Sequence, residues 1–229
     1  MKKNLVIIVA GGVGKRINSD IPKQLIKIGA KHLIEYTIES FENNSKIDLI
    51  YIVSHKKNIE NIRTIVNNRS FSKVKKILNG GRTRQLSSRI GVYASDESVK
   101  NILIHDAARP FISSGLIDSI LSNLDKFSAV NLAVSSTDTL IETSGKMMKK
   151  QIDRDIIKKV QTPQGFRRQI ILDSHKLAEK DGIEGFTDDC SMVHSYKLSD
   201  IYVQKGEESN FKITFKEDIE LAEKIISGK

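Results

Sequence analysis

A glycine-rich loop near the start of the chain carries the first residues that could do chemistry. Gly11, Gly12 and Gly14 follow a short apolar run, with Arg16 and Lys23 close behind them. Backbone N–H groups of a glycine loop can approach an anion because no Cβ atom intervenes. A loop at the carboxyl end of the first strand is also where α/β sheets bind phosphates. The segment therefore predicts a phosphate site with cations beside it.

Two common phosphate-binding fingerprints do not fit this loop. A dinucleotide-binding loop would need a third glycine where Ile17 stands, and a Walker loop would need Ser or Thr where Arg16 stands. Taken alone, the loop could also be a glycine turn with solvated cations. Its interpretation therefore depends on the other motifs.

A second glycine pair and an acidic residue repeat the arrangement. The pair that ends at Gly81 precedes Arg84 and Ser87 at the predicted start of a helix, whose free N–H groups and dipole favour an anion or a base-edge acceptor. Asp106 ends an apolar run, which suits a hard oxygen ligand for Mg²⁺ beside two phosphate loops. Capping of the next helix is the alternative role for Asp106. His105 is more typical of a packing residue than of a catalyst.

The elements that must position these residues follow from the hydrophobic pattern. Short apolar runs alternate with segments of helical period, as in βαβ units around a mostly parallel sheet. We therefore expect an α/β, Rossmann-like fold with helices on both faces. The predicted buried strands are 4–10, 48–54, 74–78, 101–105 and 129–135, and the predicted helices lie around 34–41, 56–67, 113–126 and 214–227.

The C-terminal helix has the clearest boundaries. Thr214 and Glu217 are spaced as a capping box, and Gly228 ends the helix. Its apolar stripe, at i, i+4, i+7 and i+11, consists of Phe215, Ile219, Ala222 and Ile226.

The alternation breaks at about 137–161. A short β-like run, Ser144–Gly145 and the basic stretch 146–150 favour a protruding β-hairpin arm over a βα crossover. A lone two-stranded hairpin is marginally stable in water, so we expect the arm to dock on another surface.

The amino-acid composition limits the classes of partner that the protein is expected to bind. The 37 Lys and Arg residues against 28 Asp and Glu give a formal charge of +9, which suits nucleic acid, an anionic membrane surface or a polyphosphorylated small molecule. The cations are scattered and few aromatic residues accompany them, which argues against nucleic-acid binding. No run approaches the roughly 18 apolar residues of a membrane helix, so no membrane partner is expected. With a single cysteine and no signal-peptide cleavage pattern, a cytoplasmic location is expected.

Taken together, the motifs resemble the family of 2-C-methyl-D-erythritol 4-phosphate cytidylyltransferases, to which ribitol 5-phosphate cytidylyltransferases of cell-envelope polymer synthesis also belong. The resemblance covers nearly the whole chain. In order, the motifs are Ala10–Gly11–Gly12 with Pro22–Lys23–Gln24, Gly80–Gly81 with Arg84 and Ser87, His105–Asp106 with Arg109, Asp138–Thr139, Asp153–Arg154, Gln161–Thr162–Pro163–Gln164, Thr187–Asp188, and Lys212–Ile213–Thr214.

This resemblance implies attack by a polyol phosphate oxygen on the α-phosphorus of CTP, giving a CDP-polyol and pyrophosphate. Such transfers need positioning and charge neutralisation more than covalent chemistry. It also implies a single nucleotidyltransferase domain over 1–229 with the arm inserted at about 137–161. The implied residues are Arg16, Lys23 and Lys212 for catalysis, Ala10, Gly11, Gly12, Gly14, Gly81, Arg84 and Ser87 for the nucleotide, Arg109, Thr139, Arg154 and Thr187 for the acceptor, and Asp106 for Mg²⁺.

In that family the arm clasps a second subunit, which implies a homodimer in which Thr139 and Arg154 serve the partner's site. The sequence does not decide which of the two polyol phosphates is the acceptor substrate. Gly11, the run 135–137 and Ile141–Glu142 look like the ribitol phosphate branch, whereas 106–109 and 163–166 look like the methylerythritol branch. Another sugar-phosphate nucleotidyltransferase and a non-enzymatic basic binding module are the alternative functions.

Overall fold

A seven-stranded sheet forms the centre of the computed structural model, which describes residues 2–12 and 21–228. The strand order is β11-β7-β10-β6-β1-β4-β5. Only β10 runs antiparallel to its neighbours, so the predicted mostly parallel sheet is confirmed. The strands are β1 (Lys3–Ala10), β4 (Leu49–Ser54), β5 (Val74–Asn79), β6 (Val99–Asp106), β7 (Ala129–Ser135), β10 (Lys158–Arg167) and β11 (Tyr202–Lys205).

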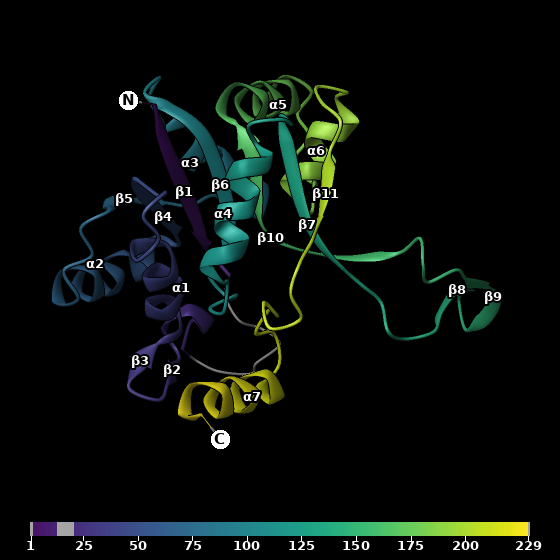
Figure 1. The fold of residues 1–229 in the computed structure, drawn as a ribbon, viewed down its shortest axis with the longest axis horizontal. Helices are drawn as coiled ribbons and strands as arrows, with labels where there is room; N and C mark the ends of the chain where they lie inside the picture. Colours follow the sequence, from purple (N-terminus) through teal and green to yellow (C-terminus); the bar gives the residue numbers. More distant parts are fainter. Residues whose placement is uncertain (1, 13–20, 229) are drawn as a thin grey trace.

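Helices cover both faces of the sheet, as expected (Figure 1). Val6 and Ile8 of β1 pack with α1, α2 and α4, whereas Leu5 and Ile7 pack with α3, α5 and α6. Successive side chains of a strand point to opposite faces, and β1 is apolar throughout because it is buried on both. The helices are α1 (Leu33–Glu42), α2 (Ile59–Asn68), α3 (Arg84–Tyr93), α4 (Ser114–Asn123), α5 (Arg168–Lys180), α6 (Asp189–Ser195) and α7 (Lys216–Ser227), with the short 3-10 helices η1 (Lys23–Leu25) and η2 (Lys56–Asn58).

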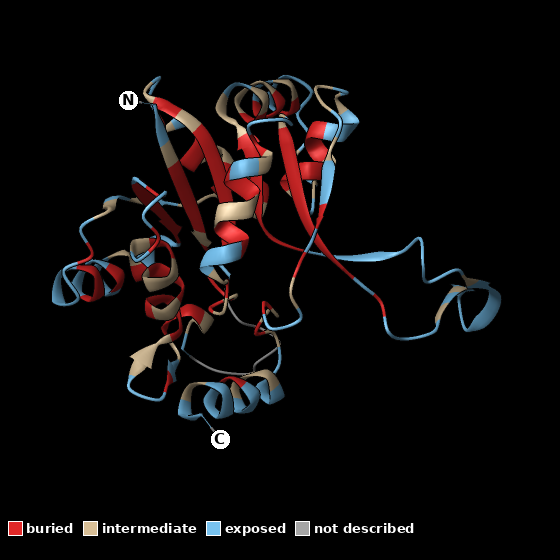
Figure 2. Cartoon of the chain, viewed as in Figure 1, coloured by how far each residue is buried: buried red, intermediate tan, exposed pale blue. Residues whose placement is uncertain are grey.

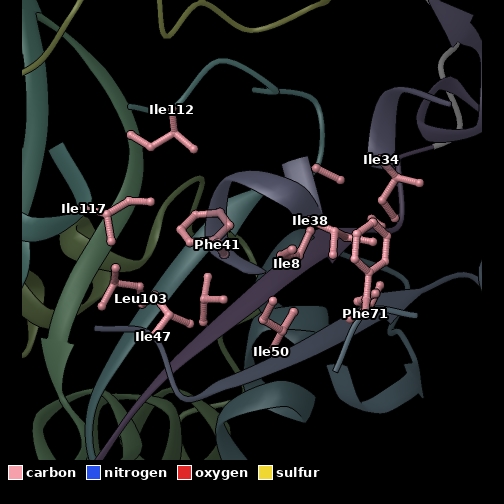
Figure 3. Close-up of a cluster of buried hydrophobic side chains, with 14 of the residues drawn as sticks. Ile8, Ile34, Ile38, Phe41, Ile47, Ile50, Phe71, Leu103, Ile112 and Ile117 are labelled. Atoms are coloured by element: carbon pink, nitrogen blue, oxygen red, sulfur yellow. The ribbon is translucent and has the colours of Figure 1, made fainter. Parts of the chain in front are cut away.

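The larger core cluster joins α1 to the middle of the sheet (Figure 3). Ile8, Ile38 and Phe41 are completely buried there, together with Ile50 and Leu103 from neighbouring strands. Each such side chain contributes about 1.5–3 kcal/mol when removed from water. The central strands are correspondingly buried along most of their length (Figure 2). The core therefore fixes the positions at which β1 and β6 end.

The strand order also marks where a ligand should bind. From β1 the chain adds β4 and then β5 on one side, and it returns to place β6 on the other side of β1. In parallel α/β sheets, ligands bind at the carboxyl ends of the strands beside such a reversal. Here those ends are Ala10 and Asp106.

The predicted arm is a two-stranded hairpin of β8 (Leu140–Ser144) and β9 (Met147–Ile152). Ser144 pairs with Met147 across the turn, where Gly145 has a φ of +57° that glycine adopts without steric cost. The arm projects far from the sheet (Figure 1). A second small sheet pairs β2 (Lys27–Ile28) with β3 (Lys31–His32).

Two local predictions were wrong. The strand at 74–78 is not buried: it lies in β5 at the edge of the sheet, where Lys75 and Lys76 are exposed. The cap of the last helix uses Asp218 instead of Glu217, because Asp218 Oδ2 accepts the backbone N–H groups of Thr214 and Phe215 at 2.7 and 2.8 Å.

Within 2–12 and 21–228, no helix is long and apolar enough to cross a membrane.

Candidate active site

A cavity of about 430 Å³ opens at the carboxyl ends of β1 and β6. It is the place that the strand reversal indicates. Nine of the residues singled out from the sequence line this cavity, namely Ala10, Gly11, Gly12, Lys23, Gly81, Arg84, Ser87, Asp106 and Lys212. The cavity therefore brings together the predicted glycine loops, the strand-end carboxylate and two of the three predicted catalytic cations.

Asp106 lies between two cations. Arg84 Nε donates to Asp106 Oδ1 at 3.0 Å, and Lys212 Nζ donates to Oδ2 at 2.5 Å. Burial alone would raise the pKa of this carboxyl, but the charges of Arg84 and Lys212 hold the pKa of Asp106 well below its ordinary value. Asp106 is therefore an anion at neutral pH, although it is only 8% exposed.

The segment that carries Lys212 is tied to the end of β6 and to η1. The Ile213 N–H donates to the Ala108 carbonyl at 2.9 Å, and Lys23 Nζ donates to the Ile213 carbonyl at 2.6 Å. Lys23 and Lys212 thus face one cavity from segments that are almost two hundred residues apart in the sequence. Their separation in sequence explains why no local pattern links them.

The first turn of α3 forms another wall. Thr83 caps the helix by accepting the Leu86 N–H at 3.1 Å, and Thr83, Arg84 and Ser87 all line the cavity. A Cβ atom on Gly81 would overlap that of Leu86, so this close turn requires glycine. A Cβ atom on Gly11 would meet Ser87 Oγ at 3.6 Å, an ordinary contact.

His105 is a packing residue, as its position in a strand suggested. It is fully buried, and burial lowers its pKa to about 4, so the ring is neutral at physiological pH. Its Nε2 lies 2.9 Å from the Arg109 carbonyl and its Nδ1 lies 3.1 Å from Thr162 Oγ1. Because a carbonyl only accepts, Nε2 carries the proton and Nδ1 accepts from Thr162, whose oxygen in turn accepts the Asp106 N–H at 3.1 Å.

The predicted acceptor residues do not line this cavity. The Arg109 guanidinium donates to the carbonyls of Asn210 at 2.8 Å and Val160 at 3.2 Å, at the base of the arm. Thr139 and Arg154 belong to the arm and are exposed, as is Thr187 before α6. The predicted residues Gly14 and Arg16 lie outside the described residues.

Several residues of the site were missed. Gln24 and Thr214 line the cavity and belong to motifs quoted from the sequence, but no site role was assigned to them; Thr83, next to Arg84, also lines the cavity. Asp189 accepts from Arg84 Nη1 at 2.7 Å and is buried behind the cavity. Nothing in the local pattern shows that this acid points inward, so only the fold reveals it. The other cavity residues are Val9, Arg82, Ala107 and Ala108.

Comparisons with known proteins agree with this geometry. The model of the IspD family, 2-C-methyl-D-erythritol 4-phosphate cytidylyltransferase, matches residues 4–228. The enzyme of that description from Clostridium tetani is 37% identical over 227 residues, covering 99% of this chain and 91% of the relative. A bifunctional ribulose 5-phosphate reductase/CDP-ribitol pyrophosphorylase, Bcs1 from Haemophilus influenzae, is 34% identical, and the match covers 99% of this chain but 49% of that protein.

The fold has matches among solved structures. A 4-diphosphocytidyl-2C-methyl-D-erythritol synthase from Anaerococcus prevotii superposes with a TM-score of 0.86 at 29% identity, covering 99% of this chain and 96% of the other. The cytidylyltransferase of Thermus thermophilus gives a TM-score of 0.80 at 26% identity, with 96% and 98% coverage. The chain therefore belongs to the 2-C-methyl-D-erythritol 4-phosphate cytidylyltransferase family.

Proposed function

We propose that the protein transfers CMP from CTP to the phosphate of a polyol phosphate, giving a CDP-polyol and pyrophosphate. The observation that carries this proposal is the cavity at the carboxyl ends of β1 and β6, where Asp106, Lys23 and Lys212 meet two glycine turns. Membership of the cytidylyltransferase family supports the same chemistry. The alternative function, a non-enzymatic basic binding module, would not explain why the glycine turns and Asp106 lie together in one cavity.

The nucleotide binds against the walls made by β1 and α3. Ala10 ends β1 with little side-chain bulk, Gly11 and Gly12 follow it, and Gly81 and Ser87 also line the cavity. We expect the base to lie against these two turns. The triphosphate extends toward Lys23 and Lys212, with Gly14 and Arg16 as further predicted contacts.

Asp106 is the residue that we propose to hold Mg²⁺. Mg²⁺ in nucleotide sites is usually held by one or two carboxylates together with phosphate oxygens and water. Asp106 supplies one ionised carboxylate that lines the cavity, and the described residues contain no cluster of three or more His, Cys, Asp or Glu that would hold a metal alone. The bound ion would neutralise phosphate charge and orient the triphosphate.

The transfer is an in-line displacement at the α-phosphorus. An oxygen of the acceptor phosphate forms the new P–O bond, the bond from the α-phosphorus to the bridging oxygen breaks, and pyrophosphate leaves with that electron pair. Lys23 and Lys212 stabilise the negative charge that grows on the phosphoryl oxygens, because they are fixed cations in a partly buried site. No proton transfer from an enzyme base is needed, because the attacking phosphate oxygen is already anionic.

We infer that the acceptor is 2-C-methyl-D-erythritol 4-phosphate, and the descriptions of the family model and of the Clostridium relatives support this choice. Ribitol 5-phosphate is the second candidate, because the Haemophilus protein is named as a CDP-ribitol pyrophosphorylase. Arg109, Thr139, Arg154 and Thr187 remain the predicted acceptor contacts. The run 135–137 and Ile141–Glu142, which look like the ribitol branch, lie at the base of the arm and on β8, outside the cavity lining.

The enzyme acts as a homodimer joined through the arms. Thr139 and Arg154 lie on the arm and do not line the cavity of their own chain. Their position supports a role at the site of a neighbouring subunit. The arm also exposes large apolar side chains that water does not favour, namely Ile141, Met147, Met148, Ile156 and Val160. A cytoplasmic location remains a prediction.

Identification of the reaction product tests the proposed function. The protein is incubated with CTP, Mg²⁺ and each polyol phosphate in turn. The CDP-polyol is identified by mass spectrometry, and the amount of pyrophosphate released is measured. We expect CDP-methylerythritol at a kcat/KM above that for the ribitol product, and neither with ATP or GTP as donor. A higher kcat/KM with ribitol 5-phosphate would make ribitol 5-phosphate the acceptor. Equal use of purine triphosphates as donors would contradict the proposed cytidylyl transfer.

A further inference from the structure

Gln24 is a buried amide in the wall of the cavity. It follows Lys23 in η1, lines the cavity and is only 3% exposed, whereas the next residue, Leu25, packs in the larger core cluster. Gln24 Nε2 is buried, and residues 2–12 and 21–228 hold no hydrogen-bond partner for it. A buried N–H group without an acceptor costs free energy. The chain therefore bears this cost at a place where a bound ligand would remove it.

Protein acceptors in the same cavity lining are already engaged. The Ala107 carbonyl accepts from Thr37 Oγ1 at 3.0 Å, and the Ala108 carbonyl accepts the Ile213 N–H at 2.9 Å. The two oxygens of Asp106 each accept from a neighbouring cation. The acceptor that Gln24 lacks is therefore one that a ligand can bring.

A second side chain of the lining has the same need. Arg84 Nη2 is buried and has no partner among the described residues, although Nε and Nη1 donate to Asp106 and Asp189. Of the buried side-chain atoms that lack a partner in the described part of the chain, those on cavity-lining residues are Gln24 Nε2 and Arg84 Nη2, and both are donors. A ligand that satisfies them must bring acceptors. Phosphate oxygens are strong acceptors, and their negative charge suits the cations of this cavity.

We propose that Gln24 is a substrate-binding residue that donates its amide N–H to a phosphate oxygen of CTP. This inference rests on the proposed function, and it deepens it by giving the triphosphate a neutral donor beside the cation Lys23. Because the amide nitrogen has no partner in the free protein, the fold should tolerate its loss, whereas nucleotide binding should not. A residue needed only for the fold would show the opposite pattern.

Gln24→Met tests the proposal, because methionine has a similar length and lacks the donor. Gln204→Met is the matched control: Gln204 is also a buried amide, but it lies on β11 outside the cavity, and its Oε1 accepts from Asn123 Nδ2 at 2.8 Å. The urea midpoint of each free protein is measured first. The dissociation constants of CTP and of cytidine, which has no phosphate, are then measured by calorimetry in the same buffer.

We expect Gln24→Met to weaken CTP binding about 10- to 100-fold, the range for losing a hydrogen bond to a charged group. Cytidine binding should stay at the wild-type value, and the urea midpoint should be unchanged or higher, because a buried donor without a partner has been removed. Gln204→Met should lower the urea midpoint, because it takes the acceptor from Asn123, and should leave CTP binding unchanged.

Wild-type CTP binding by Gln24→Met would overturn the inference. Equal weakening of CTP and cytidine would also overturn it, because Gln24 would then act on the nucleoside and not on the phosphates. If Gln24→Met does not fold, Gln24→Leu takes its place; failure of both variants to fold would show that the fold itself needs the amide, and the inference would fail. In each of these cases product formation by the wild-type protein still upholds the proposed function. A wild-type protein that forms no CDP-polyol contradicts the proposed function itself.

Discussion

Asp106 owes its charge to its two neighbours. A carboxylate that is almost fully buried would be neutral without compensation, yet Arg84 and Lys212 keep its pKa far below its ordinary value. The cost of burying three charged groups together is offset only because each is hydrogen-bonded to another. The site thus holds a fixed anion and fixed cations in the same cavity.

Lys23→Ala should lower turnover by about 10²-fold or more, as the loss of one preorganised charge-stabilising group does. Folding stability should change little, because Lys23 is only partly buried. Lys27→Ala is the control, since Lys27 is exposed and lies outside the cavity. Steady-state kinetics with saturating CTP and urea unfolding measure the two quantities. Turnover near wild type in Lys23→Ala would make Lys23 a surface cation without a role in the transfer.

The two glycine turns should differ in their tolerance of a methyl group. Gly81→Ala should destabilise the fold and reduce CTP binding, because the added Cβ atom overlaps Leu86. An overpacked site of this kind usually costs about 1–3 kcal/mol. Gly11→Ala should keep both stability and activity, because its Cβ atom would meet Ser87 at an ordinary distance. Urea unfolding and CTP titration of the two variants check this; a severe loss in Gly11→Ala would show that the nucleotide itself needs that space.

At the scale of elements, short segments do most of the positioning. The first turn of α3 places Arg84 and Ser87 at the cavity, and its next residue, Gln85, holds the loop before α6 by donating to the Ile183 carbonyl at 2.7 Å and accepting the Phe186 N–H at 3.0 Å. The same turn therefore forms one wall of the cavity and holds the loop that carries Thr187.

The start of α7 offers a direct test at this scale. Asp218→Ala should destabilise the protein by about 1 kcal/mol, because Asp218 satisfies two backbone N–H groups at the helix N-terminus. Glu217→Ala should have little effect, although the sequence pattern had assigned the cap to Glu217. Thermal or urea unfolding of both variants distinguishes the two caps. Equal losses would mean that the two acids act only through the helix dipole.

The strands that were predicted from sequence are those with continuous apolar runs, such as β1 and β4. β10 was not predicted as a strand, because Pro163 and Gly165 interrupt its pattern. β11 is short and mostly exposed, with Val203 facing solvent, so its hydrophobic pattern is weak too. The glycine turns and Asp106 were predicted because they lie at or after strand ends, where a sheet binds ligands, whereas Lys212 was assigned only from the resemblance to the family. Asp189 was not, because its burial depends on packing between α3 and α6.

At the scale of the whole molecule, the arm and the cavity lie apart in one chain. Figure 1 shows the hairpin extending away from the sheet, with its base where β7 leaves and β10 enters. Arg109 joins the Val160 carbonyl at that base to the Asn210 carbonyl, close to the segment that carries Lys212. Arg109 therefore holds the base of the arm to the segment before Lys212, although it does not line the cavity.

The proposed exchange of arms predicts recovery of activity between inactive chains. Lys23→Ala damages the cavity of its own chain, whereas Arg154→Ala damages only the site that its arm reaches. In a dimer of one variant with the other, one composite site keeps both residues and the other loses both. Each such heterodimer should show about half of the wild-type activity, because a twofold dimer has two equivalent sites. The two purified variants are mixed, subunit exchange is followed by native mass spectrometry, and turnover is measured before and after. Because neither variant alone should exceed background, recovered turnover places Lys23 and Arg154 on different chains of one site. Complete exchange without recovery would place them on the same chain, and an active monomer would remove the arm from catalysis altogether.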